Sequence, residues 1–308
     1  MTVFLIVLFI LVLIVLIASY IVYRKTFYTP VKHQNDIEWM NGHYKYAIKI
    51  AEMTNSMAAR KCEMVYTESE DGLKLEGRYY SSPVSPSAPV AICAHGYRGV
   101  SLMDFSGGGP LMLNLGMNVL LISERGCMGS EGHTITFGVK EKGDILRWIE
   151  WVKKRNGEDT PIYLMGISMG AHTVLYSSDS LAGSNIRGII ADCPYTSSRA
   201  ITDKVLASHG FSPKALRWFV NLTTSLWGGF MLTSRGAVEA VKKSSVPILI
   251  IHGTDDHLVP FHMSEEIRDA APDRVTLVPV EGAGHAESYL TNKNKYVEAV
   301  EKFVSATK

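Results

Sequence analysis

The feature that most restricts how this chain can fold is a serine held between two glycines, in Gly166-Ile167-Ser168-Met169-Gly170. An apolar run at 161–165 precedes it and starts with a proline, which is typical of a buried strand. Residues 171–176 continue with the pattern of a helix. A serine at a sharp turn from strand to helix adopts a strained backbone conformation, and glycines on either side avoid a steric clash. The pentapeptide therefore predicts a strand, a tight turn that carries Ser168, and a helix.

Strand-like apolar runs alternate with helical patterns from about residue 62 to the C-terminus. Several runs are almost continuous Val, Ile and Leu, which is typical of parallel strands covered by helices on both faces. A turn at Glu70-Asp71-Gly72 predicts an antiparallel hairpin at the start, and a helix is expected around 140–155. We expect an α/β fold with a mostly parallel, eight-stranded sheet in one domain over 62–308, with strands at 62–67, 75–80, 90–95, 119–123, 162–166, 186–191, 248–252 and 275–280.

Polar side chains follow the serine in the order that a triad of serine, acid and histidine requires. The strand expected at 248–252 is followed by Asp255 and Asp256, and an acid just past that strand can orient an imidazole at the carboxyl edge of the sheet. His285 lies in a glycine-flanked loop after the last strand, where it can reach Ser168 as the general base. Either aspartate can supply the acid.

Attack of a serine on an acyl group builds negative charge on the carbonyl oxygen, so backbone N–H groups must be aimed at that position. The amide of Met169, directly after the serine, is one expected donor. The second is the Tyr97 amide, in the loop His95-Gly96-Tyr97-Arg98-Gly99 that follows an expected strand. We interpret four other histidines as structural: His133, His172, His252 and His262.

Between about 65 and 303 the chain resembles the bacterial α/β-hydrolases of the serine-aminopeptidase-like and dienelactone-hydrolase-like group, in particular their membrane-anchored Firmicute members. The segments that carry the resemblance are His95–Gly99, Gly129–Gly132, Ile135–Gly138, Gly166–Ala171, Ala191–Ser197 and His252–Pro260.

The resemblance implies an α/β-hydrolase fold with a helical lid. The usual H-G-x-x-D-x-x-V-P spacing of the group selects Asp256 rather than Asp255 as the acid, and this leaves Asp192 as a less favoured substitute. The group's roles carry over to Ser168, Asp256 and His285 as the catalytic residues, and to the backbone amides of Tyr97 and Met169 as the oxyanion hole.

One loop departs from the group's pattern. Related proteins usually carry R-[AG]-H-G-x-S-x-G, whereas Arg125-Gly126-Cys127-Met128-Gly129-Ser130 lacks the histidine and the glycine after it. The departure implies a different substrate preference with the same chemistry. We interpret Cys127 as a small buried residue in the place of the histidine; a redox-sensitive thiol is the alternative.

The sequence gives no sign of a cofactor, a metal or a nucleic-acid partner. The four cysteines, Cys62, Cys93, Cys127 and Cys193, have no C-x-x-C or metal-ligand spacing, so we expect free thiols. No phosphate loop, dinucleotide fingerprint or basic patch is present, and the formal net charge is +1.

The N-terminal segment is the second strong signal. No charged residue occurs from Thr2 to Tyr23, a stretch long enough to cross a hydrocarbon core of about 30 Å. A cleaved signal peptide is the alternative, but no basic residue precedes the run and Ala18-Ser19-Tyr20 is a poor cleavage site. We expect a transmembrane anchor at 1–23. Arg24, Lys25 and Lys32 after it, with no basic residue before it, predict a catalytic domain on the cytoplasmic side.

Two further segments are expected to be helical. Apolar residues at helical spacing between Ile37 and Ala51 predict a juxtamembrane helix within 24–61, which either packs on the domain or lies on the lipid surface. About fifty residues, 194–246, separate two expected strands and are long enough for a helical lid. The apolar residues of this lid segment are Phe211, Leu216, Trp218, Phe219, Leu222, Leu226, Trp227, Phe230 and Met231.

These features together predict a serine hydrolase that cleaves an acyl ester through an acyl-enzyme, with a small-molecule acyl substrate. An apolar lid on a membrane-bound enzyme favours a lipid-like or hydrophobic acyl group. A peptidase or amidase, an acyltransferase with the same triad, and a membrane-tethered binding module without catalysis are the alternatives.

Overall fold

A computed structural model describes residues 1–29, 44–85, 87–183 and 185–307, and an eight-stranded sheet lies at its centre. The strand order is β1-β2-β4-β3-β5-β6-β7-β8. β2 pairs antiparallel with β1 and β4, whereas the other pairings are parallel. The strands are β1 (Glu63–Glu68), β2 (Lys74–Tyr80), β3 (Val90–Ala94), β4 (Asn118–Ile122), β5 (Ile162–Ile167), β6 (Ile186–Asp192), β7 (Ile248–Gly253) and β8 (Val275–Val280).

The predicted fold class is confirmed, and each strand begins and ends within one residue of its expected bounds. The hairpin turn between β1 and β2 is also present. Gly72 adopts a φ of 81°, a left-handed conformation that glycine reaches without steric cost. The hydroxyl oxygen of Ser69 accepts a hydrogen bond from the Leu73 amide and closes the turn.

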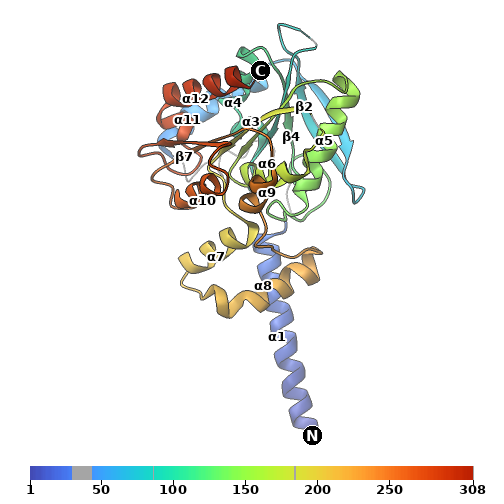
Figure 1. Ribbon diagram of the computed structural model, residues 1–308. Helices are drawn as coiled ribbons and strands as arrows, with labels where there is room; N and C mark the ends of the chain where they lie inside the picture. Colours follow the sequence, from blue (N-terminus) through green and yellow to red (C-terminus); the bar gives the residue numbers. More distant parts are fainter. Residues whose placement is uncertain (30–43, 86, 184, 308) are drawn as a thin grey trace.

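Helices cover both faces of the sheet and enclose two clusters of buried apolar side chains (Figure 1). Successive residues of β3 point to opposite faces. Ile92 belongs to the cluster with Trp148 of α5 (Glu141–Asn156), and Cys93 belongs to the cluster with Tyr296 of α12 (Lys293–Ala306). The helices after β2 are α3 (Ser101–Asp104), α4 (Gly108–Asn114), α5 (Glu141–Asn156), α6 (Met169–Ser177), η3 (Ser178–Ser180), α7 (Ser198–Ser208), α8 (Pro213–Gly228), α9 (Ala237–Lys243), α10 (His262–Ala270), α11 (Ser288–Thr291) and α12 (Lys293–Ala306).

The first helix, α1 (Thr2–Thr26), projects from the domain as a single rod, with α7 and α8 beside the point where it leaves (Figure 1). It is long and apolar enough to be a membrane anchor or a signal sequence, and an 18-residue stretch of it has a mean hydropathy of 3.4. Its last turns belong to the domain. Tyr23 and Phe27 are buried in a cluster with Val220 and Phe230.

The chain after α1 is fixed by backbone hydrogen bonds to the loop that precedes α5. The Ile135 amide donates to the Phe27 carbonyl oxygen at 2.8 Å, and the Thr29 amide donates to the His133 carbonyl oxygen at 2.8 Å. The Tyr23 hydroxyl lies 2.7 Å from the Thr134 hydroxyl. α1 is therefore joined rigidly to the domain.

The helix expected within 24–61 is described only in its second half, as η2 (Tyr44–Tyr46) and α2 (Ala47–Ala58). The expected residues Ile37 and Met40 lie outside the described part of the chain. Met57 of α2 is fully buried in the cluster that contains Tyr296, so α2 packs on the domain that was expected to begin at residue 62.

Candidate active site

Ser168 lies at the turn that joins β5 to α6, with a φ of 54° and a ψ of −110°. This conformation is strained for a residue with a side chain, and the glycines around it make it possible. A Cβ atom at Gly166 would overlap the carbonyl group of Gly170, and one at Gly170 would overlap the carbonyl oxygen of Ala94 in β3. The turn therefore requires glycine at both positions. It places the Ser168 side chain at the carboxyl edge of the sheet.

The structure brings Ser168, His285 and Asp256 into one chain of hydrogen bonds. His285 Nδ1 lies 2.7 Å from Asp256 Oδ2, and His285 Nε2 lies 2.9 Å from Ser168 Oγ. An ionised carboxylate can only accept hydrogen bonds, so Nδ1 carries the ring proton and donates a hydrogen bond to Asp256. In the neutral ring Nε2 is then unprotonated and accepts the hydrogen bond from the Ser168 hydroxyl. The imidazole is thus oriented to remove a proton from Ser168.

Asp256 is buried and fully hydrogen-bonded. Its Oδ1 accepts from the amides of Leu258 at 2.9 Å and Val259 at 2.8 Å. Burial acts to raise the pKa of this carboxyl, but the hydrogen bonds from His252 and His285 outweigh burial and hold the pKa well below its usual range. Asp256 therefore stays ionised and can stabilise a positive charge on His285.

His252 is a second histidine on the same carboxylate. Its Nε2 lies 3.2 Å from Asp256 Oδ2, and its Nδ1 lies 2.6 Å from the Ser264 hydroxyl. The sequence predicts a structural role for His252 but not this contact with Asp256. The available signal was its position at the end of β7, four residues before Asp256. Asp255, the alternative acid, is exposed and bonds to the Thr254 hydroxyl.

The loop that was expected to bind the oxyanion follows β3 and lies beside the serine. Gly96 and Tyr97 line the same cavity as Ser168. Two hydrogen bonds fix the conformation of the loop. The Gly96 amide donates to Asp104 Oδ2 of α3 at 2.8 Å, and the Gly99 amide donates to the Gly96 carbonyl oxygen at 3.0 Å. Met169 begins α6, so its amide points out of the first turn of a helix.

The same loop is attached to the end of α1. The Tyr97 hydroxyl donates to the Thr26 carbonyl oxygen at 2.6 Å. The Arg98 guanidinium donates to the carbonyl oxygens of Lys25 at 2.9 Å and Tyr28 at 2.8 Å. The Tyr97 ring also stacks on Phe137, with 5.2 Å between the ring centroids. The sequence contained no signal for these contacts.

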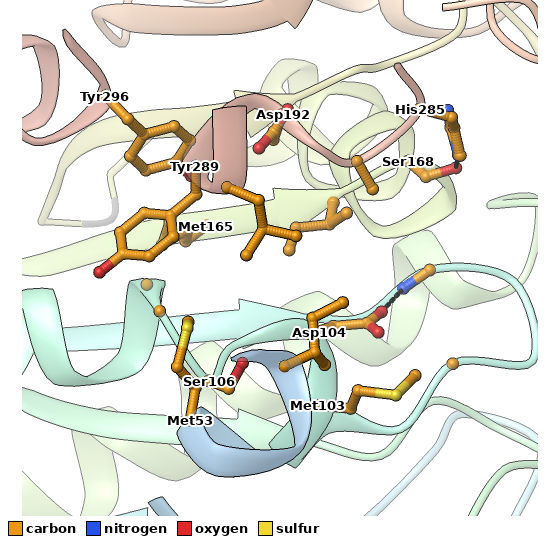
Figure 2. A pocket seen from close by; sticks show the side chains of 18 of the residues that line it. Met53, Met103, Asp104, Ser106, Met165, Ser168, Asp192, His285, Tyr289 and Tyr296 are labelled. Carbon is orange, nitrogen blue, oxygen red and sulfur yellow. Dashed lines mark hydrogen bonds between the residues drawn. The ribbon is translucent and has the colours of Figure 1, made fainter. Parts of the chain in front are cut away.

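A cavity of about 270 Å³ opens beside Ser168 and His285. Figure 2 shows these two residues at one end of the cavity, with Tyr289, Tyr296 and Met165 at the other. Apolar side chains form most of the wall. They are Ile50, Met53, Met103, Met165, Ile167, Leu258, Ala286, Tyr289, Leu290 and Tyr296. A cavity of this size and composition suits an apolar group linked to a carbonyl that reaches Ser168.

One wall of the cavity comes from α2, through Ile50 and Met53. Among the described residues that line the cavity, none comes from 194–246, the segment expected to be a lid. That segment is helical, but α8 contacts α1 instead: Trp227 Nε1 donates to the Ser19 hydroxyl at 2.9 Å. The sequence predicted a helix around Ile48 and left its place against the domain open.

A buried acid, Asp192, also lines the cavity. Burial raises the pKa of this carboxyl to about 6, and the hydroxyl of Ser288 donates to it at 3.1 Å. The carboxylate that His285 Nδ1 contacts is that of Asp256, so Asp192 does not occupy the position of the triad acid.

Cys193, Asp256 and His285 have potential metal-ligand atoms within 4.8 Å of one another. Burial raises the pKa of the Cys193 thiol well above its usual range, which disfavours the thiolate that a metal would need. Asp256 and His285 are committed to hydrogen bonds with each other and with their neighbours. The donor set therefore suits proton transfer better than metal binding.

The loop that departs from the group's pattern is organised around Arg125. This buried guanidinium bonds to Asp144 through two contacts of 2.7 Å and to Asp71 at 2.9 Å. Cys127 is buried, and burial raises the pKa of its thiol. A buried, protonated thiol reacts slowly with oxidants, which agrees with a packing role.

Comparison with known proteins agrees with this architecture. The model of the X-Pro dipeptidyl-peptidase family (S15) matches residues 16–219. YqkD of Bacillus subtilis, an uncharacterised protein, is 26% identical over 76% of this chain and 76% of its own length. The lysophosphatidylserine lipase ABHD12 of Xenopus tropicalis is 26% identical over 74% of this chain, a match that spans 61% of the lipase.

Solved structures show the same fold. An esterase of Pyrococcus furiosus, Pf2001, superposes with a TM-score of 0.66 at 22% identity, over 81% of this chain and 92% of the esterase. Est1E of Butyrivibrio proteoclasticus, solved with bound ferulic acid, superposes with a TM-score of 0.60 at 21% identity, over 79% of this chain and 98% of that one. The predicted fold class is confirmed by these superpositions.

Proposed function

The chain is an α/β-hydrolase of the X-Pro dipeptidyl-peptidase (S15) family, and from this premise we propose that it is a serine hydrolase that cleaves acyl esters. Ser168 is the proposed nucleophile, His285 the general base and Asp256 the residue that orients it. The observation that carries the proposal is the hydrogen-bonded chain, with 2.9 Å from Ser168 Oγ to His285 Nε2 and 2.7 Å from His285 Nδ1 to Asp256 Oδ2.

In the proposed reaction, Ser168 Oγ attacks the carbonyl carbon of the ester while His285 Nε2 takes the hydroxyl proton. The amides of Tyr97 and Met169 donate to the oxyanion that forms. The bond to the alcohol oxygen then breaks, and His285 returns the proton to that oxygen. Water attacks the acyl-enzyme and gives a proton to His285. The bond from the acyl carbon to Ser168 Oγ then breaks, and His285 returns the proton to Oγ, which releases the acid and free Ser168.

The proposed substrate carries a hydrophobic acyl group. The cavity supports this, because its walls are mostly apolar and its volume is about 270 Å³. The similarity to a lysophosphatidylserine lipase adds support for a lipid-like substrate.

The proposed location is a membrane, with α1 as the anchor and the catalytic domain on the cytoplasmic side. α1 has 25 residues and spans about 37 Å at 1.5 Å per residue, which exceeds a hydrocarbon core of about 30 Å. Arg24 and Lys25 in its last turn support the cytoplasmic orientation.

A peptidase is the second candidate, because the matching family is described as X-Pro dipeptidyl-peptidases. The same triad would cleave an amide with an amine as the leaving group. Above a pH of about 6 the ionised Asp192 could attract a cationic group into the cavity. Transfer of the acyl group to an acceptor other than water would use the same residues.

Labelling with a fluorophosphonate tests the nucleophile directly. The full chain and a Ser106→Ala variant should be labelled, because Ser106 lines the cavity but lies outside the proposed hydrogen-bonded chain. Ser168→Ala should not be labelled. Absence of labelling in the wild-type chain would contradict the serine hydrolase. A series of p-nitrophenyl esters and an X-Pro anilide then separates the esterase from the peptidase, since turnover of the anilide alone would favour the peptidase.

A further inference from the structure

α8 has a buried inner face and an exposed, apolar outer face. Val220, Thr223 and Thr224 are buried at helical spacing and form the inner face. Trp218 is 59% exposed and Leu226 is 51% exposed, and both are four residues from Leu222, so these three form an outer face. Exposed apolar residues continue on either side of the helix, at Phe211 and Met231.

Soluble proteins seldom leave such a row of large apolar side chains in water. The charged residues of α8, Lys214 and Arg217, are both basic. Arg217 forms an ion pair with Asp203 of α7 at 3.3 Å, whereas Lys214 is exposed beside the outer face. An apolar face with basic residues is the composition of helices that lie at the surface of a bilayer. The outer face of α8 thus has the chemistry of a lipid contact.

The position of α8 along α1 agrees with this chemistry. The Trp227 indole donates to the Ser19 hydroxyl, and its ring meets the edge of Tyr20 with 5.0 Å between centroids. From Thr2 to Ser19 the helix rises by about 26 Å, close to the thickness of a hydrocarbon core of about 30 Å. If this part of α1 fills the bilayer core, the bilayer surface meets α1 at the level of α8 (Figure 1).

The domain cannot swing away from this level, because the end of α1 is part of it. Phe27 is buried against Phe230 and Phe137, with 5.6 Å between centroids in each pair. Backbone hydrogen bonds join Phe27 and Thr29 to the loop before α5. The direction of α1 therefore fixes which surface of the domain faces the bilayer, and α8 lies on that surface.

We propose that the outer face of α8 is a membrane-docking surface. Trp218, Leu222 and Leu226 enter the boundary between headgroups and acyl chains of the leaflet that faces the domain, and Lys214 lies near lipid phosphates. This inference rests on the proposal that α1 spans the membrane. The domain then contacts one leaflet twice, through α1 and through α8. The docking also sets how far the active site lies from the bilayer surface, because Thr26, which accepts the hydrogen bond from Tyr97, lies about 10 Å beyond Ser19 along α1.

Depth-dependent quenching in the full chain tests the contact. An environment-sensitive fluorophore is attached to Leu226→Cys in a Cys62→Ser background, because the other three cysteines are buried. The protein is placed in nanodiscs whose lipids are brominated near the headgroup end of the acyl chain. The matched control is Val84→Cys. Val84 is 76% exposed and lies in the loop between β2 and β3, at the amino end of β3 and therefore opposite the carboxyl edge that carries Ser168. The proposal predicts strong quenching at 226 and none at 84.

A second measurement uses a double variant, Trp218→Asp with Leu226→Asp, which places two negative charges on the outer face of α8. The control is the single variant Val84→Asp. Hydrolysis of an ester substrate held in vesicles should fall severalfold in the double variant, while hydrolysis of a soluble p-nitrophenyl ester stays equal to wild type. The Val84→Asp variant should keep both rates.

Each contrary result has a separate meaning. Extraction with alkaline carbonate tests whether the chain is anchored in the membrane. If the chain resists extraction but position 226 is not quenched, the docking surface is overturned and the anchor is kept. Release of the chain by carbonate would overturn the anchor and the docking surface together. Two copies in one nanodisc, with 226 protected from the quencher, would show that a second chain covers α8 and would overturn the lipid contact. Fluorophosphonate labelling reports on catalysis independently of all three.

Discussion

The side-chain hydroxyl of Tyr97 donates a 2.6 Å hydrogen bond to the carbonyl oxygen of Thr26, which links the loop beside the active-site serine to the last turn of α1. The two residues are 71 positions apart in the chain. Arg98, next to Tyr97, adopts a φ of 52° and bonds to two further carbonyl oxygens at the end of α1. The conformation of the proposed oxyanion loop therefore depends on α1.

Replacing Tyr97 by Phe should lower kcat/KM on a soluble ester by up to about fivefold, since such a hydrogen bond contributes about 1 kcal/mol and all of it could be lost in the transition state. The control is Tyr23→Phe, which removes the hydroxyl contact with Thr134 and leaves the oxyanion loop unchanged. Both variants lose one hydrogen bond of α1, so their melting temperatures should fall alike. An equal kcat/KM in the two variants would show that the Tyr97 contact does not affect catalysis.

Replacing Asp256 by Asn should lower kcat by about 10⁴-fold, because an amide no longer holds His285 in the tautomer that accepts the Ser168 proton. Asp255→Asn is the matched control and should keep wild-type kcat, since Asp255 is exposed and contacts Thr254. Steady-state rates on one p-nitrophenyl ester decide between the two. Greater loss in Asp255→Asn would assign the acid to the other aspartate.

Asp192 should make the folded state less stable as the pH rises. Its pKa is raised from 3.8 to about 6, so between these values the folded state binds more protons than the unfolded state, and stability falls as the pH increases through this window. Asp192→Asn keeps the acceptor for Ser288 and removes the charge. Relative to wild type, the variant should gain nothing near pH 4 and about 3 kcal/mol above pH 6, since one pKa unit equals about 1.4 kcal/mol. Urea unfolding in detergent across this range measures the difference. A gain that does not vary with pH would contradict the assignment.

Met53→Trp should shift the preference of the enzyme toward shorter acyl chains. The larger side chain would fill part of the cavity that Met53 lines from α2. Ile48→Trp adds the same side chain on the same helix at a position that is 78% exposed, and should leave the preference unchanged. The ratio of kcat/KM for a medium-chain and an acetyl ester is the measurement. An unchanged ratio in Met53→Trp would show that α2 does not contact the acyl chain during the reaction.

The elements of the sheet and the serine turn could be predicted because their signals are local. Strand β5, the turn and α6 are encoded within a few residues, where the strained φ of Ser168 requires glycines that any such turn would need. The apolar runs that form the strands follow the same logic, since a strand buried on both faces must be apolar throughout. Ser168 and His285 were expected from their places at the carboxyl ends of strands, and the resemblance to the hydrolase group selected Asp256 rather than Asp255. The structure places these three residues in contact.

The sequence by itself thus determined the α/β fold, the strands, Ser168, His285 and an acid at Asp255 or Asp256, because each depends on short-range spacing and on the carboxyl edge that parallel strands share. Only the tertiary structure decided which helix lines the cavity, that His252 is a second partner of Asp256, and that α1 holds both Tyr97 and α8. Ser19 and Trp227 are 208 residues apart. Such contacts arise when whole elements pack together, and the residues that make them carry no local pattern that distinguishes them from other apolar or aromatic positions.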